Sequence, residues 1–237
     1  MRYNRFFGDF DFTGKTIKSS DKELINQLAN VLRLKAGAEV ILCDGKNNEA
    51  LCLIGSLNKS QVIFEVIKIE ISTKEFTADI ILYCSILKKE NFEFIIQKAV
   101  ELGVKEIVPI ITKRTVKLGL KEDRIGKIIK ESAEQSGRGI LPVLGQEMAM
   151  EEAVESARSN EINIFFELGR KSFIRSGLNI AQSKKIGIFI GPEGGWDPDE
   201  IKLAETNKFQ LIGLSPFTLR AETAVVAGLA VVIQQFQ

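Results

Sequence analysis

The residue types best suited to chemistry lie in two loops near the end of the chain. Residues 190–195 read IGPEGG and directly follow a short apolar run, and residues 214–223 follow a second apolar run at 209–214. Short apolar runs that end in glycine and proline are typical of buried strands followed by sharp loops. Because glycine has no side chain, a ligand can approach such a loop closely and bind its backbone N–H groups. The two loops therefore predict a ligand site, although two ordinary strand-to-helix turns would have the same appearance.

The lack of histidine limits the chemistry that such a site can perform. The chain has no histidine, and its three cysteines are Cys43, Cys52 and Cys84. No two of them have zinc-ligand spacing, so the sequence indicates buried structural thiols and no metal site. Without imidazole, the usual general base, any proton transfer would depend on carboxylates, hydroxyls, cationic side chains or backbone groups.

Each loop is followed by signals for the start of a helix. Asp197 can cap a helix, Pro198 then occupies its first position, and Glu200 lies three residues after the cap. A final helix is expected over residues 221–234, and we expect it to be buried on all sides because residues 224–233 include no polar side chain. Ligands of open α/β sheets bind beyond the carboxyl ends of the strands, where these loops would lie.

These motifs, taken in order, resemble the SPOUT-type RNA methyltransferases and most closely the RsmE family, which methylates N3 of a uridine in small-subunit ribosomal RNA. The two C-terminal loops, IGPEGG and LSPFTLRAETA, carry the main part of the resemblance. Further matches are VLR at 31–33, FIIQKAVELGV at 94–104 and EQSGR at 134–138, so the resemblance covers nearly the whole chain. Each motif alone is weakly specific, and their shared order is what makes the resemblance strong.

The resemblance implies that S-adenosylmethionine is the cofactor and methyl donor. Its adenosine would lie among three loops, where Ile190, Leu214 and Leu219 supply apolar walls and backbone groups bind the adenine edge. The residues predicted to bind the cofactor are Phe166, Glu167, Ile190, Gly191, Pro192, Glu193, Gly194, Gly195, Leu214, Ser215, Leu219 and Thr223.

Three charged residues are the catalytic candidates that follow from the resemblance. The uridine N3 becomes nucleophilic as its proton leaves, and Arg220 is predicted to stabilise the negative charge that spreads over the base. Glu222 is predicted to accept the proton directly or through water, although a carboxylate in the first turn of a helix can also be purely structural. Arg138 is predicted to bind RNA phosphate or to complete the site across a dimer.

Positive charge is concentrated in the middle of the chain. The net charge is only +1, but residues 112–138 hold eight Lys or Arg and four acids, a local net charge of 8 − 4 = +4. Such a stretch can contact phosphates, although interleaved acids at helical spacing also describe a solvated helix face. The residues predicted to bind RNA are Arg33, Lys113, Arg114 and Arg138.

Two domains are expected, separated by a linker over residues 71–77 that contains Ser and Thr. Before it, apolar runs at 40–43, 50–54 and 62–69 predict several short strands of a small barrel, with one helix over 20–32 capped by Ser20 or Asp21. After it, strands alternate with helices, which predicts an α/β fold with a mostly parallel sheet. The predicted strands are 78–86, 107–111, 162–166, 186–190 and 209–214, and the predicted helices between them include 91–102, 123–136 and 151–158.

The resemblance completes this fold prediction. It implies a PUA-like β-barrel RNA-binding domain at residues 1–72 and a SPOUT methyltransferase domain at residues 73–237, an α/β knot in which the last helix is threaded as part of a trefoil knot. It also implies a homodimer, with 16S ribosomal RNA within the small ribosomal subunit as the partner. The chain departs from the family at Gln27 or its neighbours, where histidine is frequent, at residues 215–217, where Gly and Arg are frequent, and at Ala221, where Thr is usual.

The remaining totals exclude several classes of protein. No apolar run approaches the ~20 residues of a membrane span, and the N-terminus has no signal-peptide pattern, so we expect a cytoplasmic protein with no membrane partner. A nucleotide-hydrolysing P-loop is rejected because the GKT at 14–16 lacks the required glycine at Asp9. A dinucleotide oxidoreductase is disfavoured because the chain has no G-x-G-x-x-G. A non-catalytic RNA-binding assembly factor remains the alternative function, although the intact GPEGG and LRAET favour catalysis.

Overall fold

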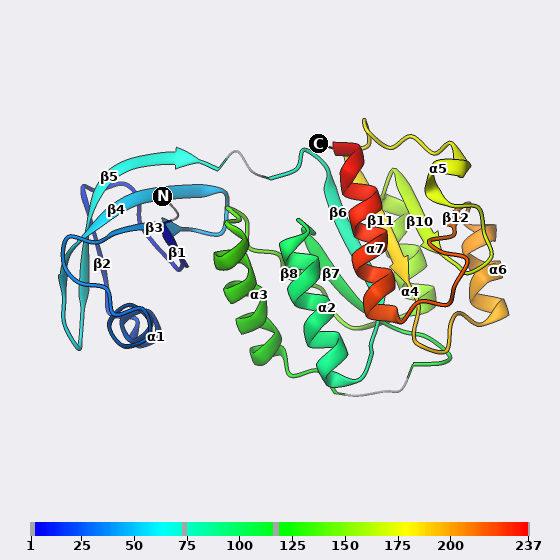
Figure 1. The fold of residues 1–237 in the computed structure, drawn as a ribbon, viewed down its shortest axis with the longest axis horizontal. Coiled ribbons are helices and arrows are strands. Elements are labelled where there is room, and N and C mark those ends of the chain that lie inside the picture. Colours follow the sequence, from blue (N-terminus) through cyan, green and yellow to red (C-terminus); the bar gives the residue numbers. More distant parts are fainter. Residues whose placement is uncertain (1–2, 73–74, 116–118, 237) are drawn as a thin grey trace. The chain divides into compact units, whose positions relative to one another are not determined.

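The computed structural model describes residues 3–72, 75–115 and 119–236, which form two compact units (Figure 1). The first unit comprises Met1–Glu75 with Ala133–Leu141, and the second comprises Phe76–Ser132 with Pro142–Gln237. Residues 73–74 of the predicted linker and residues 116–118 of the basic stretch lie outside the described part of the chain.

A five-stranded sheet in the order β1-β3-β4-β5-β2 forms the first unit. Only the β1–β3 pair is parallel, and the other neighbours are antiparallel. The sequence predicts three of these strands and misses β1 and β2, because four-residue strands carry too little alternation to be recognised. The strands are β1 (Asn4–Phe7), β2 (Thr16–Ser19), β3 (Glu39–Cys43), β4 (Asn48–Leu57) and β5 (Val62–Ile71).

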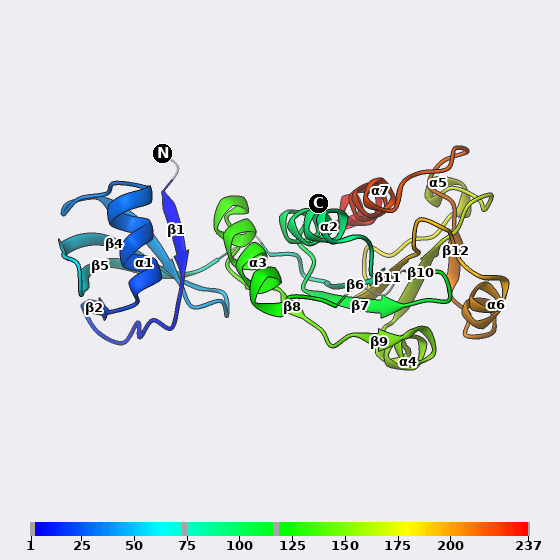
Figure 2. The ribbon, with the colours of Figure 1, turned by 90° about the horizontal axis from the view of Figure 1, so that it is seen from below.

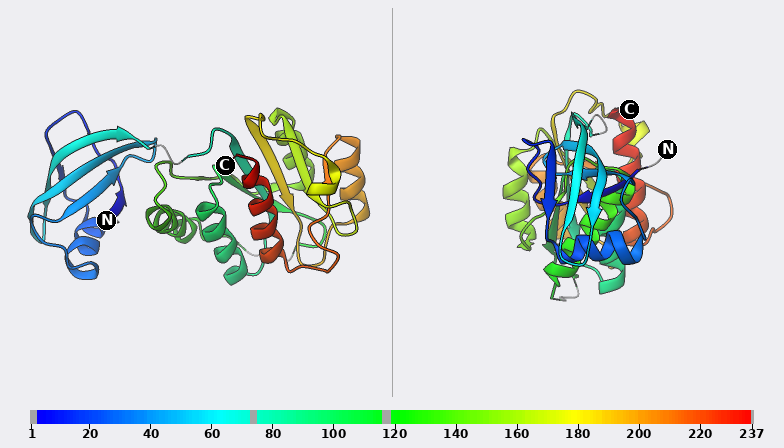
Figure 3. Two further views of the ribbon diagram at one scale, coloured as in Figure 1. Left: turned by 45° about the horizontal axis from the view of Figure 1, so that its top comes forward. Right: turned by 90° about the vertical axis from the view of Figure 1, so that its left-hand side faces the viewer.

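The predicted helix of the first unit is present, but its second half is wound differently. α1 (Lys22–Asn26) continues directly into η1 (Gln27–Val31), a π-helical turn. Asp21 caps α1, since its carboxylate accepts a hydrogen bond from the Glu23 N–H at 2.8 Å. The helix lies against the sheet (Figure 3), and its Leu28 is fully buried in a cluster with apolar residues of the strands.

The segment Ala133–Leu141 belongs to the first unit. Two of its charged side chains form hydrogen bonds with residues of that unit. Glu134 accepts hydrogen bonds from the Phe7 N–H at 3.1 Å and from Gln27 Nε2 at 3.0 Å. Arg138 donates to both carboxylate oxygens of Glu75, at 3.3 and 2.7 Å. The EQSGR motif therefore has a structural role in this unit, since its side chains connect the segment to the sheet, the helix and Glu75.

A parallel sheet of seven strands forms the second unit, in the order β12-β10-β11-β6-β7-β8, with β9 also paired to β7. This confirms the prediction of a mostly parallel α/β sheet (Figure 2). The sequence misses β8 and β9, which are two residues long each. The strands are β6 (Asp79–Ser85), β7 (Glu106–Ile111), β8 (Val143–Leu144), β9 (Met148–Ala149), β10 (Ile162–Phe166), β11 (Lys185–Ile190) and β12 (Gln210–Ile212).

Helices cover both faces of this sheet, as the near-continuous apolar strands require. α2 and α7 lie side by side on one face, and α4 and α6 lie on the other (Figure 2). The helices are α2 (Lys89–Glu101), α3 (Glu122–Ser136), α4 (Met150–Ser156), α5 (Phe173–Ser176), α6 (Pro198–Thr206) and α7 (Ala221–Ile233), and the short 3-10 turns are η2 (Ala157–Ser159) and η3 (Gln234–Phe236). None of the helices in the described residues is long and apolar enough to cross a membrane.

Aromatic rings fill the face that α4 and α6 cover. Tyr83 stacks on Phe189 with ring centroids 4.4 Å apart, and Phe165 stacks on Trp196 at 4.3 Å. Phe209, just before β12, contacts Phe189 at 5.0 Å. The row of rings joins the strands β6, β11 and β10 to the loop that follows β11, and so fixes that loop to the core.

On the opposite face, α7 approaches the sheet closely because it carries glycine at its contact point. A Cβ atom at Gly228 would lie 2.7 Å from the Phe166 ring. The side of α7 that faces away from the sheet is half-exposed at Val226, Ala227, Ala230 and Val231. The expectation that this helix is buried on all sides is therefore wrong for the single chain, because an apolar composition does not by itself bring a second layer to cover it. The threading of this helix through a knot stays a prediction.

The Glu75–Arg138 pair is expected to contribute to the stability of the first unit. Burial alone would raise the pKa of Glu75, but hydrogen bonds and charge from Arg138, together with the N–H groups of Ile140 and Gly139, hold its pKa below the ordinary value. Both side chains are nearly buried, with 7% of Arg138 and 12% of Glu75 exposed. Replacing one partner would leave a buried charge without its main counter-charge.

We expect Glu75→Ala to lower the free energy of unfolding by about 3 kcal/mol, as for other broken buried ion pairs. Because the pKa of Glu75 is lowered on folding, its ionised form contributes stability at neutral pH, and this contribution is lost as the pH falls through the lowered pKa. Urea denaturation of wild type and Glu75→Gln at a series of pH values measures this. The gap between their midpoints should narrow in acid, and a gap that is constant with pH would contradict the assignment.

Candidate functional site

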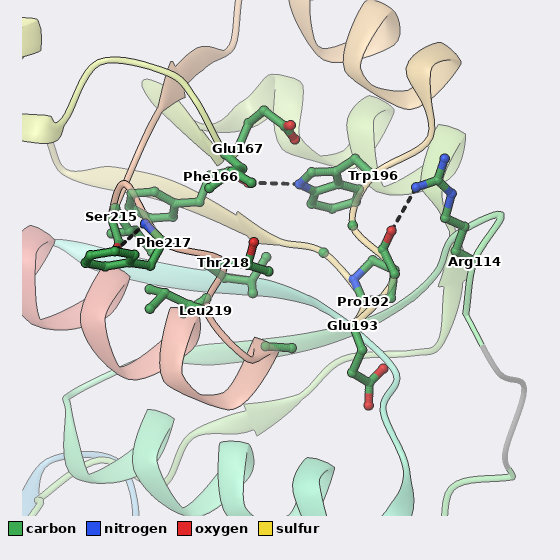
Figure 4. Close-up of a pocket in the computed structure, with 18 residues that line it drawn as sticks. Arg114, Phe166, Glu167, Pro192, Glu193, Trp196, Ser215, Phe217, Thr218 and Leu219 are labelled. Atoms are coloured by element: carbon green, nitrogen blue, oxygen red, sulfur yellow. Dashed lines mark hydrogen bonds between the residues drawn. The ribbon is translucent and has the colours of Figure 1, made fainter.

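Loops at the carboxyl ends of β10, β11 and β12 surround a pocket of about 320 Å³ in the second unit (Figure 4). The start of α7 and Arg114, from the loop after β7, complete its walls. This is the position at which open parallel sheets bind ligands. The pocket is lined by Arg114, Phe166, Glu167, Leu168, Ile190, Gly191, Pro192, Glu193, Gly194, Gly195, Trp196, Leu214, Ser215, Phe217, Thr218, Leu219, Ala221 and Ala224.

Trp196 joins two of these loops. Its indole Nε1–H donates a buried hydrogen bond of 2.9 Å to the carbonyl of Phe166 at the end of β10. Its ring stacks on Phe165 and contacts Gly191, where a Cβ atom would lie 2.9 Å from the indole. Trp196 therefore fixes this part of the pocket through a hydrogen bond to Phe166, stacking on Phe165 and close packing against Gly191.

The glycine loop folds into a tight turn before α6. The Gly195 N–H donates to the Pro192 carbonyl at 2.9 Å, and Gly195 has a φ of 70°, in the region that favours glycine. α6 then starts as predicted: Asp197 accepts a hydrogen bond from the Asp199 N–H, and Glu200 accepts one from the Asp197 N–H at 2.8 Å. The predicted capping box is confirmed.

Two neighbouring basic residues after β7 have different surroundings. Lys113 pairs with Asp199 and Asp197, and its hydrogen bonds to these carboxylates raise the pKa of its ammonium group. Arg114 instead turns towards the pocket, where its Nη1 donates a hydrogen bond of 2.7 Å to the Gly194 carbonyl. The buried carboxylate of Glu200 accepts the Lys113 N–H at 2.8 Å and so fixes the backbone of this loop.

The other end of the same loop is anchored by buried hydroxyl groups. Ser85, the last residue of β6, shares a hydrogen bond of 2.7 Å with Thr115, whose hydroxyl also accepts the Thr112 N–H at 2.9 Å. Arg114 therefore extends from a backbone that is fixed on both sides, which limits the positions its guanidinium can take.

Electrostatics distinguish the two carboxylates of the pocket. Burial raises the pKa of Glu167 above its ordinary value, and the charges of Arg170 and Arg114 offset part of that rise. Glu193 lies on the other side of the glycine loop (Figure 4), where its charge adds to the effect of burial and raises the pKa of the Cys84 thiol. A raised thiol pKa makes Cys84 unreactive, in agreement with its expected structural role.

The structure brings together nearly all residues that were predicted to bind a cofactor. Eleven of the twelve line the pocket, and the exception is Thr223, which is exposed on α7 and outside the lining. Thr223 lies three positions after the helix cap and is exposed in the first turn of α7, which a motif match cannot reveal. The contacts of these residues with a cofactor stay predictions.

The predicted catalytic residues are placed differently from one another. Arg220 is the N-cap residue of α7, is exposed, and forms no hydrogen bond or ion pair through its side chain with the described residues. Glu222, in the first turn of α7, has a buried Oε2 with no hydrogen-bond partner in the described part of the chain. Arg138 lies in the first unit, where Glu75 holds its guanidinium, so its predicted role in catalysis or RNA binding has no support from these contacts.

The four residues predicted to bind RNA have different surroundings. Arg33 is exposed at the end of the first unit's helix and has a left-handed φ of 53°, which is uncommon for a residue other than glycine. Lys113 is occupied by two carboxylates, Arg114 is a pocket residue, and Arg138 is buried. Of the four, Arg33 is therefore the one whose surroundings suit a phosphate contact directly.

Several pocket residues were not predicted. Trp196 and Arg114 have the largest structural roles among them, and the others are Leu168, Phe217, Thr218, Ala221 and Ala224. Phe217 is 75% exposed, which is unusual for an aromatic residue. The departure of residues 215–217 from the family pattern was the signal in the sequence that could have drawn attention to it. Gln27, the other departure in a polar residue, is bound to Glu134 in the first unit. The described residues contain no cluster of acids and cysteines that could hold a metal ion.

Comparison with known proteins identifies the class of this fold and site. The RNA methyltransferase domain matches residues 74–233, and the RNA methyltransferase PUA domain matches residues 21–67. The ribosomal RNA small subunit methyltransferase E of Mesomycoplasma hyopneumoniae is 33% identical over 207 residues, which cover 84% of this chain and 87% of that protein. The protein of the same name from Bacillus subtilis is 30% identical over 233 residues, covering 90% of this chain and 88% of that protein.

A solved structure agrees with these sequence matches. The crystal structure of a ribosomal RNA small subunit methyltransferase E from Neisseria gonorrhoeae, bound to S-adenosylmethionine, has a TM-score of 0.91 and 27% identity, and the match covers 99% of this chain and 98% of that one. The chain belongs to the ribosomal RNA small subunit methyltransferase E family. The predicted resemblance to the RsmE family is confirmed, including the PUA-like first domain.

The glycine loop supplies a testable prediction with a matched control. Gly191→Ala would place a Cβ atom 2.9 Å from the Trp196 indole, and the strain of about 1–3 kcal/mol would displace the indole and the loop. Gly194→Ala would meet only the flexible Arg114 side chain, at 3.4 Å. We expect Gly191→Ala to weaken S-adenosylmethionine binding about tenfold or more, and Gly194→Ala to weaken it far less.

Calorimetry measures the affinities, and the fluorescence of Trp196, the single tryptophan of the chain, reports whether the indole has moved. Equal affinities of the two variants, with unchanged Trp196 emission in Gly191→Ala, would show that this contact does not shape the pocket.

Proposed function

We propose that this chain transfers a methyl group from S-adenosylmethionine to N3 of a uridine in 16S ribosomal RNA of the small subunit. The observation that carries this proposal is the convergence of eleven predicted cofactor residues, from three loops, on one pocket of the parallel sheet. Family membership supports both the cofactor and the ribosomal RNA substrate. Since its RNA substrate is cytoplasmic in bacteria, we propose the same location for the protein.

The lining of the pocket fits S-adenosylmethionine. Ile190, Leu214 and Leu219 offer apolar surfaces for the adenine ring, and the backbone of the glycine loop offers polar groups without side-chain obstruction. The volume of about 320 Å³ is at the lower end of the usual range for pockets that enclose small ligands. When bound, S-adenosylmethionine supplies an electrophilic methyl group.

The residues at the start of α7 are suited to act on the uridine. Arg220 is exposed beside Leu219 and Ala221, two residues of the pocket wall, and its guanidinium is not engaged by the described residues. It would stabilise the negative charge on the uracil oxygens as N3 loses its proton. The buried, unpartnered Oε2 of Glu222 is a suitable acceptor for that proton, directly or through water.

The first unit is proposed to bind the RNA around the target, as the PUA match and the exposed Arg33 suggest. We propose residues 1–72 and 73–237 as the two functional domains. The segment Ala133–Leu141 packs with the first unit although it comes from the second part of the chain. The RNA domain would then include a structural contribution from the methyltransferase part.

The function is tested by incubating the protein and S-adenosylmethionine with small subunits and ribosomal RNA from a strain that lacks the enzyme. Digestion to nucleosides and mass spectrometry should show 3-methyluridine appearing in 16S RNA. RNA binding without any methylated nucleoside would instead indicate a non-catalytic assembly factor.

The catalytic role of Arg220 is tested by its effect on the rate. We expect Arg220→Ala to lower kcat by about 10²–10³, as for loss of one preorganised donor, with little change in cofactor affinity. Arg220→Lys should restore part of the rate, since lysine has charge but no planar fork. Single-turnover methyl transfer at saturating RNA is the measurement. A wild-type rate for Arg220→Ala under those conditions would mean that Arg220 only anchors RNA.

A homodimer is proposed because α7 has a half-exposed apolar side at Val226, Ala227, Ala230 and Val231. Phe94, on the neighbouring helix α2, is 42% exposed, so this helix also presents an apolar side chain to solvent. Sedimentation at micromolar concentration should give twice the chain mass of 26.4 kDa, and Phe94→Asp should shift the equilibrium towards the monomer. A fully active species of 26.4 kDa would rule out an obligate dimer.

A further inference from the structure

Three ionisable side chains line the pocket among the described residues, and their charges do not cancel. Arg114 is positive, and Glu167 and Glu193 are negative, so the lining carries a net charge of +1 − 2 = −1. S-adenosylmethionine carries a sulfonium, an α-ammonium and an α-carboxylate, and so has a net positive charge. The pocket and this ligand are therefore complementary in total charge, which raises the question of which group meets which side chain.

Arg114 has unused hydrogen-bonding capacity towards the pocket. Of the five N–H groups that a guanidinium offers, Nη1 is used in the bond of 2.7 Å to the Gly194 carbonyl. The nearest carboxylate, that of Asp197, lies 4.0 Å from Nη2, beyond hydrogen-bond distance. The side chain is 45% exposed, so a ligand can reach the remaining donors. A carboxylate is the group that a guanidinium binds best, because two parallel hydrogen bonds can form.

Glu167 is a partly buried negative charge without a side-chain donor in the described residues. Arg170, whose charge also acts on Glu167, forms its ion pair with Glu205 at 2.9 Å. The Leu168 N–H donates to this carboxylate, but no cationic side chain of the described residues forms an ion pair with it, so an ammonium group placed beside it would be stabilised. Arg114 and Glu167 both line the pocket, and the charge of Arg114 offsets part of the rise that burial causes in the pKa of Glu167.

Glu193 is less suited to this pairing. Its side chain points away from Glu167 and Arg114, on the other side of the glycine loop (Figure 4). Its charge acts on Cys84 at the end of β6. Arg114 and Glu167 form a pair of opposite charges on one side of this loop, and such a pair matches the α-amino acid group, whose ammonium and carboxylate share one carbon atom.

We propose that Arg114 and Glu167 form the subsite for the methionyl end of S-adenosylmethionine, with Arg114 binding the α-carboxylate and Glu167 binding the α-ammonium. This rests on the proposed function, which assigns the pocket to S-adenosylmethionine. It gives Arg114 a role in cofactor binding in place of the RNA contact expected from its basic stretch.

Ligands that lack one group at a time test the proposal by calorimetry. S-adenosylhomocysteine has both charged groups, decarboxylated S-adenosylmethionine lacks the carboxylate, and 5′-methylthioadenosine lacks the whole amino acid end. Arg114→Gln removes the charge but retains a donor for the Gly194 carbonyl. We expect it to weaken S-adenosylhomocysteine roughly 10- to 100-fold, as for loss of a charge-assisted hydrogen bond, and to leave the other two ligands within about threefold.

Glu167→Gln should have a different ligand profile. It should weaken both S-adenosylhomocysteine and decarboxylated S-adenosylmethionine by a similar factor and leave 5′-methylthioadenosine unchanged. Arg170→Ala is the matched control, since Arg170 also acts on Glu167 but pairs with Glu205 and does not line the pocket. It should leave the ligand profile of the wild type.

Equal weakening of all three ligands by Arg114→Gln or Glu167→Gln, in variants with the wild-type unfolding midpoint, would overturn the proposal, because the residue would then act only on the shape of the loop. Arg114→Lys provides a second check. It retains the charge, so it should recover part of the S-adenosylhomocysteine affinity, and no recovery beyond Arg114→Gln would also count against the proposal. If the wild-type protein bound none of these ligands, the cofactor assignment itself would fail, which is a distinguishable result.

Discussion

The hydrogen bond from Trp196 to the Phe166 carbonyl is the constraint on which the pocket depends. The carbonyl ends a buried strand, and the indole belongs to the loop after the neighbouring strand, so the bond of 2.9 Å joins two loops that the chain separates by 30 residues. A buried carbonyl without a donor would be unfavourable, and the indole N–H would be equally so. Stacking on Phe165 holds the ring, and the missing side chain of Gly191 gives it space. The glycine loop therefore owes its shape to a buried aromatic residue as well as to its own glycines.

The two neighbouring basic residues Lys113 and Arg114 have different roles because hydrogen bonds fix the backbone of their loop. Glu200 caps α6 through the Asp197 N–H and at the same time accepts the Lys113 N–H. The Lys113 ammonium then lies against Asp197 and Asp199 and offsets part of their charge, while the next residue, Arg114, turns to the pocket. A helix cap, an ion pair and a pocket residue thus depend on one buried carboxylate.

The sequence predicts those parts of this structure that depend on local interactions. Strands buried on both faces are mostly apolar, which is why β6, β10 and β11 could be located from the sequence. The capping box of α6 could be predicted because residues 197–200 alone form it. The loops of the cofactor pocket could be predicted because they follow those strands. The resemblance to a known family then supplied the ligand, which no pattern of residues in this chain would reveal alone.

The parts that could not be predicted depend on contacts between distant residues. Trp196 is an unremarkable aromatic residue in the sequence, and its role appears only when β10 lies beside β11. Arg138 belongs to a motif that suggests function, but Glu75, 63 residues away, accepts its hydrogen bonds. The half-exposed side of α7 was missed because apolar composition indicates that a surface should be covered and not what covers it.

We infer that the three loops around the pocket, two of which Trp196 joins, form the S-adenosylmethionine site from which methyl transfer to RNA proceeds. A crystal structure of this protein with S-adenosylmethionine tests it most directly. We predict that the adenosine lies between the glycine loop, Leu214 and Leu219, with the Trp196–Phe166 hydrogen bond retained. Cofactor density at any other place on the chain, or a pocket that opens by breaking that bond when the cofactor enters, would contradict it.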